Sequence, residues 1–385
     1  MASAPPHEPY EILFCSCDCG IGTIRVDLSS RPPLSGLERF RSTSSLTTWF
    51  SRRLFSPPGY LRCPHDLEWS GRSNLERLTL KRKPSILRRL RTEQPNHTAV
   101  DLDRKSSLEI ARLINAEDAT VAAAVARTLP QIARAIDLVA AALRRGGRLI
   151  YVGAGTSGRI AALDAVECPP TFNTDPRSVQ FIIAGGFEAL ASASEISEDD
   201  SRQGRDQMAR RKPTKIDVVL GIASSGRTPF TVAAISDARR RGAHTIALTC
   251  NPNSPLERAA HFAIVTQVGP EILAGSSRMK AGTAHKMVLN MISTAAMTRL
   301  GYVYGNLMVN VAPKNEKLTQ RAIGILERAT GAGHESSRLA LQASGRRTPV
   351  ALVMLAAGVT RVQAVAALKK SAGHVRHAIA LATTK

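Results

Sequence analysis

Hydrophobic positions follow two periods along the chain, and the order of those periods predicts the fold class. Continuous apolar runs of a few residues occur at 149–152, 179–184, 218–222, 245–248 and 262–265. Runs this short are typical of strands buried on both faces. Helically spaced stretches lie between them, notably 230–241 and 283–300. This alternation predicts an α/β fold with a parallel sheet covered on both faces.

Two helices are predicted ahead of the first strand. Ser106, with Glu109 three residues later, forms a capping-box sequence at the start of an apolar helical pattern. A second helix follows Pro130, and Gly146 with Gly147 ends it. These helices lead directly into the strand at 149–152.

Three regions of the chain differ in composition and in hydrophobic periodicity. Residues 1–84 are rich in Ser, Pro and Arg and show no sustained period, so we expect either disorder or a start assigned too far upstream. Alternatives are a soft-metal site at its Cys-x-Cys-x-Cys run, Cys15 to Cys19, and an anion-binding basic cluster. Residues 85–316 hold the α/β pattern, and 317–385 predict a small helical C-terminal domain.

Composition restricts the partners. The 385 residues carry a net charge of +21, which favours an anionic partner such as nucleic acid, a membrane surface or a phosphorylated substrate. Arginine is scattered instead of lying in one stripe interleaved with aromatics, which disfavours nucleic acid. No apolar run approaches the roughly 20 residues of a membrane helix, and no leader pattern opens the chain. We therefore expect a cytoplasmic protein with no membrane contact.

The most distinctive stretch is RLIYVGAGTSGRIAALDAVECPP, residues 148–170. A strand, a Gly/Ser loop and a helix start follow one another in it, and such a junction binds anions through free amides and the helix dipole. The prolines Pro169 and Pro170 are expected to stop the helix just after Glu167.

Two further loops have the same character. One reads ASSGRTP, residues 223–229, and the other GSSRMKAGT, residues 275–283; each opens a predicted helix. Ordinary N-caps explain one hydroxyl per loop but not paired hydroxyls beside Arg or Lys in all three. We predict a sugar-phosphate site formed by Thr156, Ser157, Gly158, Ser224, Ser225, Arg227, Thr228, Ser276, Ser277 and Lys280.

A dinucleotide site is a weaker interpretation of the first loop. Gly153-x-Gly155-x-x-Gly158 fits that fingerprint formally. However, the next strand ends in Gly-Gly-Phe187, without the acidic residue that would hold a ribose.

Carboxylates near these loops supply candidate acid–base groups. Glu167 follows the first loop by one helix, and Glu195, Glu198, Asp199 and Asp200 form an acidic turn. The turn is either a solvated surface or part of a pair that divides acid and base work.

Long ordered motifs then identify a resemblance. YVGAGTSGRIAALDAVECPPTF, GIASSGRTP, VGPEILAGSSRMKAGTA and YGNLMVNV resemble the N-acetylmuramic acid 6-phosphate etherases, which carry a sugar isomerase (SIS) domain. The resemblance covers roughly residue 92 to the C-terminus. It implies elimination of D-lactate from C3 of the sugar followed by hydration, without metal or organic cofactor, in a homodimer.

The resemblance also assigns residues. The family's catalytic glutamates fall on Glu167, assigned to protonating lactate and then deprotonating water, and on Glu198, assigned to the C2 proton. His285 stands where Gln is expected, and Phe187 where Glu is usual. We expect His285 to be a polar residue near a subunit contact. The alternatives left open are a non-catalytic sugar-phosphate sensor and an aldose–ketose isomerase.

Overall fold

The structure is a computed structural model that describes residues 90–192 and 196–384. Contacts divide the chain into units of 1–78 and 79–385, and every described residue belongs to the second. The predictions for residues 1–84, including Cys15 to Cys19, and for Glu195 lie outside the described residues.

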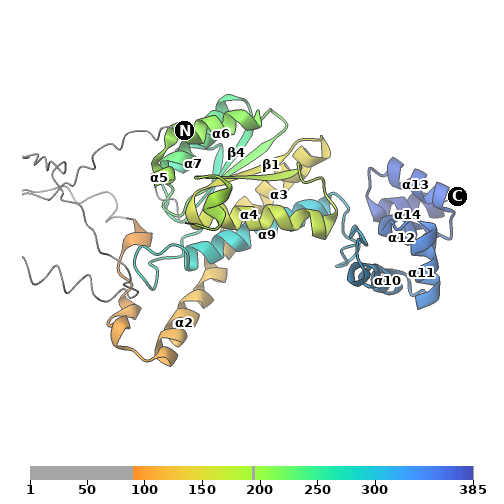
Figure 1. Ribbon diagram of the computed structural model, residues 1–385, viewed down its shortest axis with the longest axis horizontal. Helices are drawn as coiled ribbons and strands as arrows, with labels where there is room; N and C mark the ends of the chain where they lie inside the picture. Colours follow the sequence, from red (N-terminus) through yellow and green to blue (C-terminus); the bar gives the residue numbers. More distant parts are fainter. Residues whose placement is uncertain (1–89, 193–195, 385) are drawn as a thin grey trace, which may run out of the picture. The chain divides into compact units, whose positions relative to one another are not determined.

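A five-stranded parallel sheet forms the centre of the fold (Figure 1). Its strand order is β2-β1-β3-β4-β5, so the predicted α/β class is confirmed. The strands are β1 Leu149–Gly153, β2 Val179–Ile183, β3 Val218–Ile222, β4 His244–Thr249 and β5 Phe262–Val265. Each agrees with a predicted run to within one residue at either end.

Helices cover both faces, as the continuous apolar strands require. Leu149 and Tyr151 pack with α3, α4 and α9, whereas Ile150 and Val152 pack with α6, α7 and α8 on the other face. The helices of this part are α2 Ser107–Ala126, α3 Leu129–Arg144, α4 Gly155–Phe172, α5 Ile196–Asp199, α6 Ser201–Arg211, α7 Pro229–Arg240, α8 Pro255–Ala259 and α9 Lys280–Arg299. Short 3-10 turns are η2 Arg91–Glu93, η3 His97–Ala99, η4 Leu102–Arg104 and η5 Phe187–Leu190.

The two predicted helices before β1 are present. The reciprocal capping box of Ser106 and Glu109 opens α2, which confirms that sequence signal. Pro130 lies in the first turn of α3, where its missing N–H leaves no bond unmade.

The expected end of α4 is wrong. The helix runs through Pro169 and Pro170 to Phe172 and ends where Asn173 takes a left-handed conformation at φ 52°. Both prolines lie in the last turns of α4, where each lacks the N–H that would form a helical hydrogen bond. The helix continues for less than one further turn and ends where the Asn173 N–H donates to the Pro169 carbonyl. Glu167 therefore lies within α4 and not at its end.

The C-terminal helices have an apolar core of their own. They are α10 Glu316–Thr330, α11 His334–Ala343, α12 Thr348–Ala357, α13 Arg361–Lys370 and α14 Val375–Thr383. Leu326, Leu352 and Ala378 are among its fully buried members.

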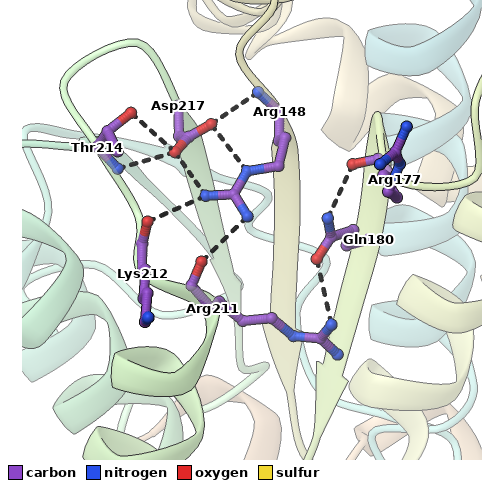
Figure 2. Close-up of polar contacts among 7 residues, drawn as sticks. All are labelled: Arg148, Arg177, Gln180, Arg211, Lys212, Thr214 and Asp217. Carbon is purple, nitrogen blue, oxygen red and sulfur yellow. Dashed lines mark hydrogen bonds and ion pairs between the residues drawn. The ribbon is translucent and has the colours of Figure 1, made fainter.

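The amino ends of the strands carry a closed polar network (Figure 2). Asp217, before β3, accepts hydrogen bonds from the Arg148 guanidinium and from the Thr214 N–H and hydroxyl. Arg148 also donates to the Arg211 and Lys212 carbonyls at the end of α6. Asp217 is 2% exposed, so this network holds a buried charge with full partners.

Within the described part of the chain, none of the helices alone has the length and apolarity to cross a membrane. Only α12 and α13 taken together meet those criteria, and they are bent at 107° to each other.

Candidate functional site

A cavity of about 310 Å³ lies at the carboxyl ends of β1 and β3. This edge is where parallel α/β sheets place ligands. Its lining combines the hydroxyls of the first two loops with two carboxylates, Glu198 and Glu93, the second of which belongs to η2. The lining residues are Thr92, Glu93, Ala154, Gly155, Thr156, Ser157, Arg159, Glu198, Ala223, Ser224, Ser225, Thr228 and Ser277.

The first loop forms the start of α4. Its N-cap is Ala154, which offers no side-chain acceptor to the amides of the first turn. Gly155 has φ 50°, and a Cβ built there would lie 2.7 Å from Glu198 Oε1. The Glu198 carboxylate therefore lies against the start of α4, beside Thr156 and Ser157. Amides, hydroxyls and a carboxylate converge at this point, as binding and proton transfer require.

The second loop is fixed through one carbonyl. Ser224 O accepts from Cys250 N at 3.0 Å, from Asn251 Nδ2 at 2.9 Å and from Thr249 Oγ1 at 3.2 Å. Asn251 also donates to the Thr92 hydroxyl at 3.1 Å and accepts from Arg91 N at 2.9 Å. Asn251 thus ties η2, which lines the cavity, to the second loop.

The third loop contributes less than predicted. Ser277 lines the cavity, but the first amides of α9 are occupied: Glu271 accepts from Lys280 N at 2.9 Å and from Ala281 N at 3.0 Å. Burial raises the pKa of the Glu271 carboxyl. The buried Lys280 ammonium pairs with Glu117 of α2. The start of α9 is therefore capped by the chain itself.

Three other predicted residues do not line the cavity. A Cβ on Gly158 would lie 2.5 Å from an Ile183 side-chain carbon, so this glycine permits close packing of α4 on β2. Arg227 donates its backbone N–H to Ser225 Oγ at 3.1 Å and is half-buried. Ser276 is half-buried beside the loop.

The two candidate glutamates lie apart within one chain. Glu198 lines the cavity, whereas Glu167 is exposed on α4 and does not line it. Glu167 lies eleven positions beyond Thr156, which corresponds to roughly 16 Å of helix rise. Of the two predicted glutamates, one chain thus presents only Glu198 to the cavity.

The two departures from the family motif have different environments. His285 is fully buried in α9, with Nε2 3.7 Å from Cys250 Sγ, and burial lowers the pKa of its ring to about 4. The expectation that His285 lies near a subunit contact stays a prediction, since the structure holds one chain. Phe187 is 75% exposed, and its ring lies 5.7 Å from that of Phe181.

The sequence interpretation missed Thr92, Glu93 and Arg159. Arg159 could have been found, because Ser-Gly-Arg recurs at Arg227. Thr92 and Glu93 precede β1 by more than fifty positions and carry no motif, so only folding brings them to the cavity.

Two further features bear on chemistry. A larger cavity of about 680 Å³ is lined by other residues, including Arg144, Thr174 and His374, and holds none of the predicted site residues. In the described ranges, no group of three or more His, Cys, Asp or Glu side chains is arranged to hold a metal ion.

Comparison with known proteins gives two family matches. Residues 131–239 match the glucokinase regulatory protein N-terminal SIS domain, and residues 199–295 match the SIS domain.

Curated relatives match over most of the chain. An N-acetylmuramic acid 6-phosphate etherase of Symbiobacterium thermophilum is 53% identical over 274 residues, covering 71% of this chain and 91% of the relative. The protein of the same name from Bacillus subtilis is 46% identical over 297 residues, covering 77% and 98%. Among solved structures, a phosphoheptose isomerase from Francisella tularensis is 20% identical, with a TM-score of 0.40, and covers 50% of this chain and 100% of that one.

Proposed function

The chain belongs to the N-acetylmuramic acid 6-phosphate etherase family, and we propose that it cleaves the D-lactyl ether of N-acetylmuramic acid 6-phosphate. The products are N-acetylglucosamine 6-phosphate and D-lactate, and the enzyme is a carbon–oxygen lyase. The observation that carries this proposal is 53% identity extending over 91% of a curated etherase.

The first two loops bind the phosphate. The hydroxyls of Thr156, Ser157, Ser224 and Ser225 line one cavity at the uncapped start of α4. Each hydroxyl donates to a phosphate oxygen, and the helix dipole favours the negative charge. Thr228 and Ser277 complete the polar wall.

Elimination begins with the open-chain sugar, whose C1 aldehyde acidifies the C2 proton. Glu198 lines the cavity and takes that proton. The electron pair forms the C2–C3 double bond as the C3–O bond breaks. Glu167 protonates the departing lactate oxygen, because an alkoxide leaves poorly without acid assistance.

Hydration restores the sugar. Glu167, now ionised, deprotonates a water molecule, which adds at C3 of the unsaturated aldehyde, and Glu198 returns its proton to C2. Protons and electrons balance over the two stages, so the two carboxylates suffice.

The protein acts as a homodimer in the cytoplasm. Support for the dimer comes from Glu167, which is exposed on α4 while the cavity of the same chain lacks a second predicted carboxylate. The cytoplasmic assignment rests on the substrate, since a charged phosphate ester does not cross a bilayer unaided.

The match to the glucokinase regulatory protein domain supports one alternative, a sensor that binds the sugar phosphate without converting it. D-lactate release separates the two functions. We expect release by the full chain and its loss in Glu198→Gln, by about 1,000-fold or more if the carboxylate is the base. Glu335→Gln, on the exposed surface of α11, is the matched control and keeps full activity. Saturable binding of the substrate without lactate would favour the sensor.

A further inference from the structure

The larger cavity, of about 680 Å³, has a chemistry that the proposed reaction does not use. The ends of α3 and α9, the loop before β2 and the turn between α13 and α14 form its wall. It shares no lining residue with the cavity that contains Glu198. We call it the basic cavity, for the reason that follows.

The side chains that carry charge near neutral pH and line the basic cavity are all basic. They are Arg144 at the end of α3, Arg299 at the end of α9, and His374 and His377. No Asp or Glu lines it among the described residues. Arg299 lies 3.4 Å from Asp137, but both side chains are 65% exposed, so solvent screens that pair. A cavity lined by one sign of charge concentrates ions of the opposite sign.

A helix start opens onto the same cavity. His374 is the N-cap of α14, and no side chain caps the amides of the first turn. These amides and the positive end of the helix dipole favour an anion. The Arg299 carbonyl, at the end of α9, already accepts a hydrogen bond from Arg144 Nη2 at 3.2 Å. One bare carbonyl that would repel an anion is therefore occupied.

The wall also contains polar atoms without a partner. Thr174 Oγ1 and His374 Nδ1 are buried and form no hydrogen bond with any described residue. Buried polar atoms are normally hydrogen-bonded, so unpaired atoms in a cavity wall indicate a ligand. Burial, followed by the nearby basic groups His377, Arg376 and Arg144, lowers the pKa of the His374 ring. The positive charge around this ring is thus not balanced by the chain.

We propose that the basic cavity binds a phosphate dianion, either free or as the phosphate group of a sugar phosphate, between Arg144, Arg299 and the start of α14. Two guanidiniums match its two charges, and its oxygens accept more hydrogen bonds than a carboxylate does. The volume leaves room for a sugar beside the phosphate. The inference does not depend on the proposed function, because no residue assigned to the reaction lines this cavity.

Histidine ring signals in NMR spectra of the full chain test this site separately. No histidine lines the cavity with Glu198 among the described residues, so binding there leaves no ring in direct contact with the ligand. Inorganic phosphate at pH 7.5 should move the signals of His374 and His377 saturably toward their protonated positions, whereas chloride at equal ionic strength should not. The signals are assigned with His374→Gln and His377→Gln.

The arginines supply the decisive variant. Arg144→Gln with Arg299→Gln removes two exposed guanidiniums, and the affinity for phosphate at the two rings should fall about 100-fold. The matched control is Arg321→Gln with Arg328→Gln, on the exposed face of α10, which should keep the wild-type affinity. Ring signals that do not move, or that move equally in both double variants, would overturn the proposal.

A second titration identifies the source of the phosphate. N-Acetylglucosamine 6-phosphate should saturate the two ring shifts at a lower concentration than inorganic phosphate if the cavity also holds the sugar. Equal midpoints would identify free phosphate as the ligand. Shifts produced by N-acetylglucosamine, which has no phosphate, would overturn the assignment. Loss of lactate release in any of these variants is not needed for either result, so a failure of the proposed function remains distinguishable.

Discussion

The two ends of β1 and β3 differ sharply in how their polar groups are satisfied. At the amino ends, Asp217 accepts hydrogen bonds from the Arg148 guanidinium, which also donates to the carbonyls that end α6 (Figure 2). At the carboxyl ends, hydroxyls and the start of α4 surround an open cavity with Glu198 in its wall. Helix polarity explains the difference, because helix ends with bare carbonyls attract cations and helix starts attract anions. One edge is therefore closed by the chain itself, and the other is left for an anionic ligand.

The largest expected effect is at the closed edge. Asp217→Asn leaves the Arg148 guanidinium without its charged partner, and we expect a loss of about 3 kcal/mol in the free energy of unfolding. Urea titration measures it. Asp206→Asn, which removes an exposed pair with Arg202 at 3.9 Å, should change stability by less than about 1 kcal/mol. A similar loss of stability in both variants would mean that the buried network in Figure 2 stabilises the fold no more than an exposed ion pair does.

The same aspartate predicts a pH dependence. Burial alone would raise the pKa of Asp217, but hydrogen bonds from Arg148 and Thr214 outweigh it and lower that pKa. Its stabilising contribution is then present above the unfolded pKa of about 3.9 and is lost as the pH falls through the folded pKa. The stability gap between wild type and Asp217→Asn should therefore narrow in acid.

A substitution at the open edge should act on catalysis instead. Gly155→Ala puts a methyl group 2.7 Å from the Glu198 carboxylate, and displacement of that group should lower kcat/KM about 100-fold. Gly331→Ala is the matched control, since Gly331 also has a positive φ, 74°, and a Cβ there would meet no atom within 4 Å. Both variants should lose about 1–2 kcal/mol from backbone strain. Equal kcat/KM in the two variants would contradict a catalytic role for Glu198.

His285 lies beside Cys250, which follows the carboxyl end of β4, and its effect on stability is confined to acid. Its folded pKa of about 4 lies below the unfolded value of about 6.5, so stability is full above pH 6.5 and falls as the pH decreases toward 4. His285→Gln lacks this proton linkage. At pH 5 we expect the wild type to lose about 2 kcal/mol more than the variant, relative to pH 7.5. Parallel pH profiles of unfolding would contradict this.

The smallest effect sharpens the view of the open edge. Asn251→Ala removes the amide that donates to both the Thr92 hydroxyl and Ser224 O, so η2 is no longer tied to the second loop. The cavity wall is then less firmly held, and we expect KM to rise about tenfold with little change in kcat. Asn310→Ala, whose amide donates to Phe172 O away from the cavity, is the control and should leave KM unchanged. A fall in kcat alone would indicate a role in the chemical step.

Local sequence determined the fold class and much of the open edge. Short continuous apolar runs between helical stretches favour buried strands. The glycine and hydroxyl residues that follow β1 and β3 then meet, because neighbouring parallel strands end on one edge. Thr156, Ser157, Ser224, Ser225 and Thr228 therefore line one cavity, and their binding of a phosphate stays a prediction.

Only the tertiary structure decided whether the remaining predicted residues line the cavity. Lys280 belongs to a hydroxyl-rich loop like the others, yet it is buried against Glu117, and Glu271 occupies the amides beside it. Thr92 reaches the cavity through a side chain 159 positions away, at Asn251. These outcomes depend on which distant partner arrives, and a local motif contains no information about that partner. The rise of α4 over the eleven positions from Thr156 likewise separates Glu167 from the cavity of its own chain.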